Sequence, residues 1–166
     1  MKRNTFIMLA LTIVLSVVLS ACSSGNNNEA AVEPNLTAKE MVDQMLTKVE
    51  QPSFMEVEEN MVEQLYHLNP AVLEDYSIRM PMMNVKSNEL AILKVKDAKD
   101  IPTIETAVKE RAADIQKSFE QYLPDQYENA QNYKLVTKGN YLLFVIADPA
   151  DQDALVREFD AFFATK

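Results

Sequence analysis

The feature that most constrains the fold is a sequence pattern that occurs twice, 51 residues apart. Each copy has an apolar, strand-like run, then Asp-x-x-Asp, then apolar residues at helical spacing; the copies begin at Leu90 and Tyr141. Anions near the positive N-terminal end of each helix account for the acidic pairs. A further strand-like segment precedes each run, at 76–83 and 133–138. We therefore predict an α+β fold in which two ββα units form a four-stranded antiparallel sheet with helices on one face.

The two most apolar runs are predicted to lie side by side in the middle of this sheet. Residues 141–146 are apolar without interruption, and 90–95 are apolar except for Lys94, which is typical of buried central strands. Pro81 cannot donate a hydrogen bond to a neighbouring strand, so 76–83 is predicted to be an edge strand or to end there.

Residues 36–166 are predicted to form a single domain behind a flexible tether. Residues 22–35 are rich in Ser, Gly, Asn, Ala and Glu without apolar periodicity, which is typical of a linker. A Thr-x-x-Glu capping box at Thr37 predicts a helix, and a second helix is expected to end before Asn69-Pro70. These N-terminal helices would pack on or beside the sheet.

Residues 1–21 have the features of a lipoprotein signal peptide. A basic start at Lys2-Arg3 is followed by an apolar run at 6–19 and by small residues before Ala21-Cys22. This run has 14 residues, whereas a membrane-spanning helix needs about 20, so a retained transmembrane anchor is disfavoured. We predict cleavage between Ala21 and Cys22 and a diacylglyceryl group on the Cys22 sulfur. A secretory signal with a chance cysteine is the alternative.

The predicted anchor places the domain on the extracytoplasmic face of the cell membrane, with the lipid bilayer as its partner through Cys22. Cleavage would leave 14 of the 16 basic residues beside 25 acidic ones, a net charge of −11. An acidic surface disfavours nucleic acid as a partner. We expect an envelope protein, a peptide or a small solute instead.

Composition excludes several kinds of site. The chain has two glycines, too few for a P-loop or a GxGxxG turn, and Cys22 is the only cysteine, so a disulfide or CxxC site is excluded. His67 is the only histidine and has no sequence-marked nucleophile beside it. We predict no cofactor and no metal site.

Five aspartates stand near the two predicted helix starts: Asp97, Asp100, Asp148, Asp151 and Asp153. We interpret them as helix-capping residues rather than as a calcium site, because the glycine and the closing glutamate of an EF-hand are missing.

Methionines are frequent, and three of them cluster at Met80, Met82 and Met83. We interpret this cluster as flexible core filling rather than as a copper(I) site. Other methionines at amphipathic positions favour the same interpretation: Met41, Met45, Met55 and Met61.

The candidate binding site is the connection after the long helix, predicted to be irregular over 123–132. Aromatic and polar residues crowd it: Tyr122, Asp125, Gln126, Tyr127 and Tyr133. Such a loop can present a hydrogen-bonding aromatic surface to a sugar, a peptide or a protein. In the alternative interpretation, the tyrosine rings pack at the rim of the sheet with their hydroxyls in water.

Four short motifs carry a family resemblance: 80–85 (Met-Pro-Met-Met-Asn-Val), 89–91 (Glu-Leu-Ala), 94–97 (Lys-Val-Lys-Asp) and 139–141 (Gly-Asn-Tyr). The chain resembles a domain-of-unknown-function family of small lipoproteins from Gram-positive bacteria over residues 41–163. Members often carry Tyr-Gly where this chain has Tyr66-His67. The resemblance implies the lipid anchor and the envelope location, and it implies no catalytic or binding residue.

These observations lead to the hypothesis of a non-enzymatic, membrane-anchored binding or accessory module. A small envelope hydrolase that uses a carboxylate pair is one alternative, because 25 acidic residues leave many pairs open. A structural subunit of a membrane complex is another.

Overall fold

The computed structural model describes residues 33–164, which belong to one compact unit. The predicted signal peptide, the cleavage site at Ala21-Cys22 and most of the tether lie outside the described residues. Within the described part of the chain, every helix is too short or too polar to cross a membrane.

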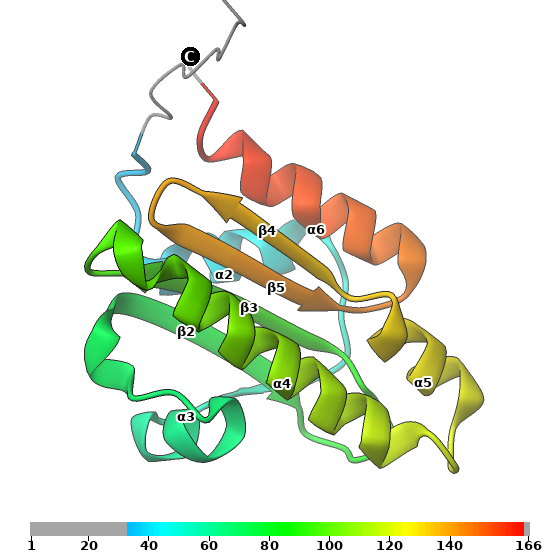
Figure 1. Cartoon of the computed structure of the whole chain (residues 1–166). Helices are drawn as coiled ribbons and strands as arrows, with labels where there is room; N and C mark the ends of the chain where they lie inside the picture. The colour runs from blue at the N-terminus through cyan, green and yellow to red at the C-terminus, as the bar shows by residue number, and fades with distance from the viewer. Residues whose placement is uncertain (1–32, 165–166) are drawn as a thin grey trace, which may run out of the picture. The chain divides into compact units, whose positions relative to one another are not determined.

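Helices and strands are interspersed along the described chain (Figure 1). In chain order they are α2 (Ala38–Lys48), β1 (Phe54–Glu56), α3 (Glu59–Tyr66), the 3-10 turn η1 (Pro70–Val72), β2 (Leu73–Pro81), β3 (Glu89–Val95), the 3-10 turn η2 (Ala98–Asp100), α4 (Ile101–Phe119), α5 (Pro124–Gln131), β4 (Lys134–Lys138), β5 (Tyr141–Ile146) and α6 (Pro149–Ala161).

The strands form one antiparallel sheet in the order β1-β2-β3-β5-β4. This confirms the α+β class and the central, adjacent positions of the two most apolar strands. The sheet has five strands rather than four, because the short strand β1 pairs with the end of β2, with Phe54 opposite Pro81. Pro81 is the last residue of β2, which agrees with its lack of an N–H donor.

Helices cover both faces of the sheet, so the prediction of helices on one face is wrong. Helices α3, α4 and α5 pack on the face that carries Leu93 and Phe144, while α2 and α6 pack on the face that carries Ile92 and Leu143 (Figure 1). The physical reason lies in β3 and β5 themselves. Successive side chains of a strand point to opposite faces, and in these strands both sets are apolar, so each face needs a cover.

The two repeat units diverge after their strands. Leu90 and Tyr141, the equivalent first residues of the two runs, both face the core under α2 and α6. The turn η2 then precedes α4, whereas α6 begins at Pro149, directly after Asp148. Helix α4 packs on one face of the sheet and α6 on the other.

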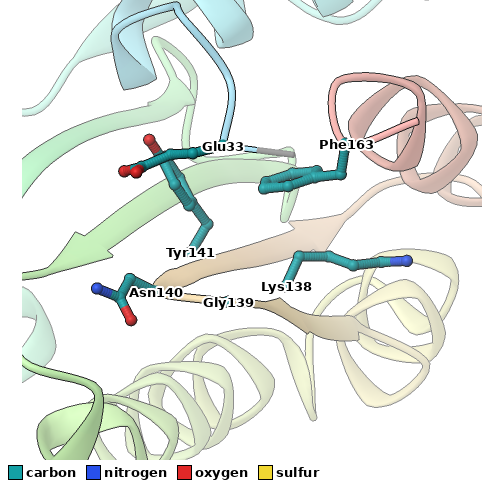
Figure 2. Close-up of a pocket in the computed structure, with 6 residues that line it drawn as sticks. All are labelled: Glu33, Lys138, Gly139, Asn140, Tyr141 and Phe163. Atoms are coloured by element: carbon teal, nitrogen blue, oxygen red, sulfur yellow. The ribbon is translucent and has the colours of Figure 1, made fainter. Parts of the chain in front are cut away.

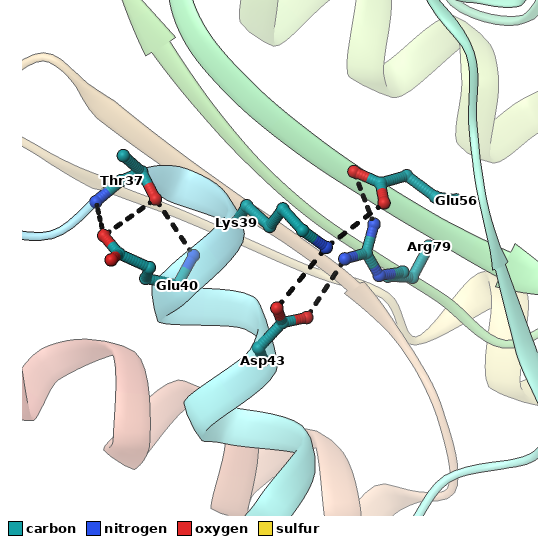
Figure 3. Close-up of polar contacts among 6 residues, drawn as sticks. All are labelled: Thr37, Lys39, Glu40, Asp43, Glu56 and Arg79. Atoms are coloured by element: carbon teal, nitrogen blue, oxygen red, sulfur yellow. Dashed lines mark hydrogen bonds and ion pairs between the residues drawn. The ribbon is translucent and has the colours of Figure 1, made fainter.

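Helix α2 begins at the predicted capping box, which the structure confirms. The Glu40 N–H donates to Thr37 Oγ1 at 3.2 Å, and the Thr37 N–H donates to Glu40 Oε2 at 2.8 Å (Figure 3). The first helical N–H, that of Ala38, donates to Asp75 Oδ2 on β2 at 2.6 Å. The start of α2 is therefore held by hydrogen bonds between Thr37 and Glu40 and by a hydrogen bond to β2.

Helix α3 ends in a left-handed residue that is not glycine. His67 is its C-cap with a φ of 52°, a conformation in which a Cβ atom is unfavourable. Its Nε2 lies 3.1 Å from Asp114 Oδ2 of α4. The tight turn is therefore present although this chain has histidine at the position.

Candidate functional site

A groove of about 390 Å³ lies where β1, the connection between β2 and β3, and the second half of α4 meet. Its walls are mainly apolar and include Met55, Met80, Met82, Met83, Ile115 and Phe119. We call it the methionine groove. Apolar walls with a few polar groups between them are the usual composition of a binding site.

Three of the methionines that line the groove are exposed, so their interpretation as core filling is wrong. The exposed fraction is 41% for Met55, 67% for Met82 and 57% for Met83. Strand β2 ends at Pro81, and the chain leaves the sheet before Met82. The interpretation is confirmed for Met41 and Met45, which lie on the buried face of α2 and are fully buried.

The connection that carries the exposed methionines is fixed at both of its ends. At its start the Met82 N–H donates to the Ser53 carbonyl at 3.0 Å, beside β1. At its other end the Ser87 N–H donates to Gln126 Oε1 at 2.9 Å, and Asn88 Nδ2 donates to Gln51 Oε1 at 3.0 Å. The methionines are therefore presented on a backbone with defined anchoring points.

A buried polar network forms the floor of the groove. Glu89, which is 2% exposed, accepts hydrogen bonds from Arg111 Nε at 3.0 Å and Nη2 at 2.6 Å, and also from the Tyr66 hydroxyl. Burial, together with the Glu89 charge, raises the pKa of Tyr66 well above its ordinary value, so Tyr66 remains a hydrogen-bond donor. The network ties β3, α3 and α4 together at the groove.

The residues of the predicted tyrosine site do not share an exposed surface. Their connection is helix α5, so the prediction of an irregular segment is wrong. Tyr122 and Asp125 are exposed, whereas Gln126 is buried and holds the groove connection. Tyr127 and Tyr133 are half-buried against the core, and the Tyr133 ring packs edge-on against a buried phenylalanine.

Two carboxylates, Asp43 of α2 and Glu56 of β1, are joined by cations (Figure 3). The largely buried Arg79 guanidinium lies 3.0 Å from each carboxylate, and Lys39 Nζ lies 3.4 Å from Asp43 and 3.3 Å from Glu56. This arrangement links α2, β1 and β2.

Both carboxyl groups have lowered pKa values. The hydrogen bond from Arg79 is the largest cause for Glu56. For Asp43 the largest single effect, desolvation, raises the pKa, but the hydrogen bonds and charges of Arg79 and Lys39 together lower it. A general acid needs a raised carboxyl pKa, so this pair suits an ion-pair clamp rather than acid catalysis.

Two of the aspartates near the helix starts, Asp97 and Asp148, accept hydrogen bonds from other residues of the domain. Asp97 accepts the Lys99 N–H at 3.0 Å and caps η2, which confirms its capping role. Asp100 and Asp148 are the N-cap residues of α4 and α6, but neither side chain makes a capping hydrogen bond, so their interpretation as side-chain caps is wrong. The Asp148 side chain instead accepts a hydrogen bond from Asn129 Nδ2 at 2.8 Å. Across residues 33–164, His, Cys, Asp and Glu form no cluster of three or more that could hold a metal ion.

A second cavity, of about 210 Å³, lies at the other end of the sheet (Figure 2). Its lining residues are Glu33, Lys138, Gly139, Asn140, Tyr141 and Phe163. Glu33 lies 2.7 Å from Lys94 Nζ, which fixes the start of the described chain here.

The methionine groove and this start of the described chain lie at opposite ends of β3. Lys94 pairs with Tyr141 at one end of the β3–β5 ladder, and Glu89 pairs with Ile146 at the other. The five residue-to-residue steps from Glu89 to Lys94 correspond to about 17 Å of strand.

Comparison with known proteins gives one family and no individual relative. No protein with a curated description and no solved structure matches the chain. One family model matches residues 47–147, from the end of α2 to the end of β5, and this range contains the methionine groove. Because the match covers more than half of the 166 residues, the chain belongs to the family defined by the domain of unknown function DUF4358.

Proposed function

We propose that this protein is a lipoprotein, held on the extracytoplasmic face of the cell membrane by diacylglyceryl Cys22, whose domain is a non-enzymatic binding module. Its ligand, a peptide or a protein of the envelope, docks in the methionine groove. The anchor rests on the signal sequence and the binding role rests on the groove.

The observation that carries the binding role is the exposure of Met55, Met82 and Met83 beside one another on a fixed backbone. Large exposed apolar patches on a soluble domain mark interaction surfaces more often than chance. Methionine side chains are flexible and polarizable, so a surface of this kind adapts to the shape of a partner.

The non-enzymatic part of the proposal is supported by the way in which acids are used. The buried Glu89 carboxylate accepts hydrogen bonds from Arg111 and Tyr66. Asp43 and Glu56, a carboxylate pair that shares the cations Arg79 and Lys39, have lowered pKa values. Neither Asp43 nor Glu56 therefore has the raised pKa that a general acid needs near neutral pH.

The position of the groove agrees with a tether that leaves from Glu33. The described chain starts at one end of β3, and the groove opens at the other end. Attachment through the N-terminal segment therefore leaves the groove accessible to a partner.

The proposal is tested by photo-crosslinking in cells. The photo-crosslinking residue p-benzoylphenylalanine replaces Met83 in one strain and Asn140, at the far end of the sheet, in a matched control strain. We expect a discrete adduct from position 83 that disappears in the Met82→Ala background and is absent from position 140. The same adducts from both positions, or none from position 83, would contradict the binding role.

A further inference from the structure

We infer that the occupant of the methionine groove is a segment of another polypeptide that combines apolar side chains with a carboxylate group. This inference rests on the proposed function and specifies the chemistry of the ligand. It follows from the charges, the free donors and the amides that the groove presents.

The groove is locally positive in an acidic protein. The chain carries a net charge of −9, yet the charged residues that line the groove are two cations, Lys86 and Arg111, and one anion, Glu89. The buried Glu89 carboxylate is balanced by its ion pair with Arg111, so the net positive charge of the lining is that of Lys86.

Both cations retain donors for a ligand. Arg111 binds Glu89 through Nε and Nη2, and its Nη1 has no hydrogen-bond partner among residues 33–164. Lys86 forms no ion pair within the described part of the chain, whereas most Lys and Arg residues in that part form at least one. It does lower the pKa of Asp125, after the larger effect of the Gln126 hydrogen bond, but the two charges do not form an ion pair.

The rest of the groove favours a polypeptide over an acyl chain as the carrier of the carboxylate. Asn84 stands among the methionines in the lining, and its side chain makes no hydrogen bond to the described residues, whereas Asn88 Nδ2 donates to Gln51 and Ser118 Oγ donates to the Asp114 carbonyl. A peptide backbone offers the Asn84 amide a donor and an acceptor, whereas an acyl chain would cover this amide without a partner, which is unfavourable. Apolar side chains of the same segment would contact the exposed Met82 and Met83.

The test uses a library of random twelve-residue peptides and the full chain purified in detergent micelles. The Met82→Ala/Met83→Ala variant serves as the counter-selection control. We expect the enriched peptides to combine apolar residues with Asp, Glu or a free C-terminal carboxylate. Their affinity should fall on the order of tenfold in the control variant, because two methionine side chains that the bound peptide would cover are lost from the contact.

The carboxylate is tested separately. Replacing Asp or Glu by Asn or Gln in a selected peptide, or Lys86→Glu in the protein, should weaken binding by roughly fivefold, as expected for one partly exposed ion pair. Added salt should weaken binding of the acidic peptide more than that of its neutral analogue. A Lys109→Glu variant, on the same protein but outside the groove lining, is the matched control for net charge.

The outcomes separate this inference from the proposed function. Enrichment of peptides without a carboxylate, binding that is unaffected by Lys86→Glu, or displacement of the peptides by free hexadecanoic acid would overturn the inference. If no peptide is enriched while position 83 still crosslinks a partner in cells, the inference fails and the binding role stands. If neither occurs, both fail.

Discussion

The Arg111 guanidinium grips the Glu89 carboxylate with two of its nitrogens, at 3.0 Å from Nε to Oε1 and 2.6 Å from Nη2 to Oε2. This pair joins the middle of α4 to the first residue of β3 and forms the floor of the methionine groove. A buried ion pair is costly to break from one side, because the remaining charge has no partner.

Arg111→Met should therefore lower the free energy of unfolding by about 3 kcal/mol, since Glu89 would be left charged and buried. Urea denaturation measures the change. The double variant Glu89→Gln/Arg111→Met should be less destabilised than Arg111→Met alone, because the uncompensated charge is gone. Equal destabilisation of the two variants would show that Arg111 acts through packing rather than through its charge.

Stability should fall in acid through the Arg79 clamp. Asp43 and Glu56 have folded-state pKa values below their ordinary ones. Their contribution is thus fully present above the unfolded values of about 4 and is lost as the pH falls through the folded values. Urea midpoints between pH 6 and pH 3 should decrease, and they should decrease less in Asp43→Asn/Glu56→Gln. An identical pH profile for that variant would contradict the role of the clamp.

At the left-handed residue that ends α3, glycine should give a more stable protein than alanine, which is the reverse of their usual order in a helix. Because His67 has a φ of 52°, His67→Gly should be more stable than His67→Ala by about 1 kcal/mol. Both variants lose the contact with Asp114, so the comparison isolates the backbone. Thermal denaturation of the two proteins checks the order, and equal stability would mean that the turn relaxes when the histidine is removed.

The exposed methionines should be dispensable for folding. Met82→Ala and Met83→Ala should each change the free energy of unfolding by less than about 0.5 kcal/mol, because neither side chain is buried. Met41→Ala, at a fully buried position, should cost about 2–5 kcal/mol. Chemical denaturation of the three variants provides the test. A large cost at position 82 or 83 would mean that the groove is part of the folding core.

Membrane attachment should depend on one sulfur atom. Cys22→Ala should move the protein into a soluble or unprocessed pool, because a diacylglyceryl group can no longer be attached. Membrane fractionation measures the distribution, and mass spectrometry of the wild-type N-terminus should find a diacylglyceryl mass on Cys22. Membrane retention of a processed Cys22→Ala protein would contradict the anchor.

Much of the fold follows from local sequence patterns. The uninterrupted apolar run 141–146 predicts a central strand, and the capping box at Thr37 predicts the start of α2. The same run also predicts helices on both faces of the sheet. Successive side chains of a strand point to opposite faces, so a strand that is apolar at every position has to be covered on both faces. Strand β1 has three residues and makes its pairs with a strand that follows more than 15 residues later, so no local pattern identifies it.

Only part of the methionine groove could be predicted from the sequence. The end of β2 at Pro81 is a local signal, and it implies that Met82 and Met83 leave the sheet. Their meeting with Met55 and with α4 depends on tertiary packing. Gln126 illustrates the opposite case, because a polar residue in an apparent loop turned out to be a buried support for the groove.

The groove connection, residues 82–88, joins two paired strands and is fastened by hydrogen bonds at Met82 and Ser87. The side chains of residues 83–86, between these two bonds, belong to neither core cluster of the sheet. Substitutions or added residues within this short stretch can therefore alter what is recognised while the scaffold remains intact. In such a protein, sequence changes confined to the loop of one β-hairpin can change the binding specificity.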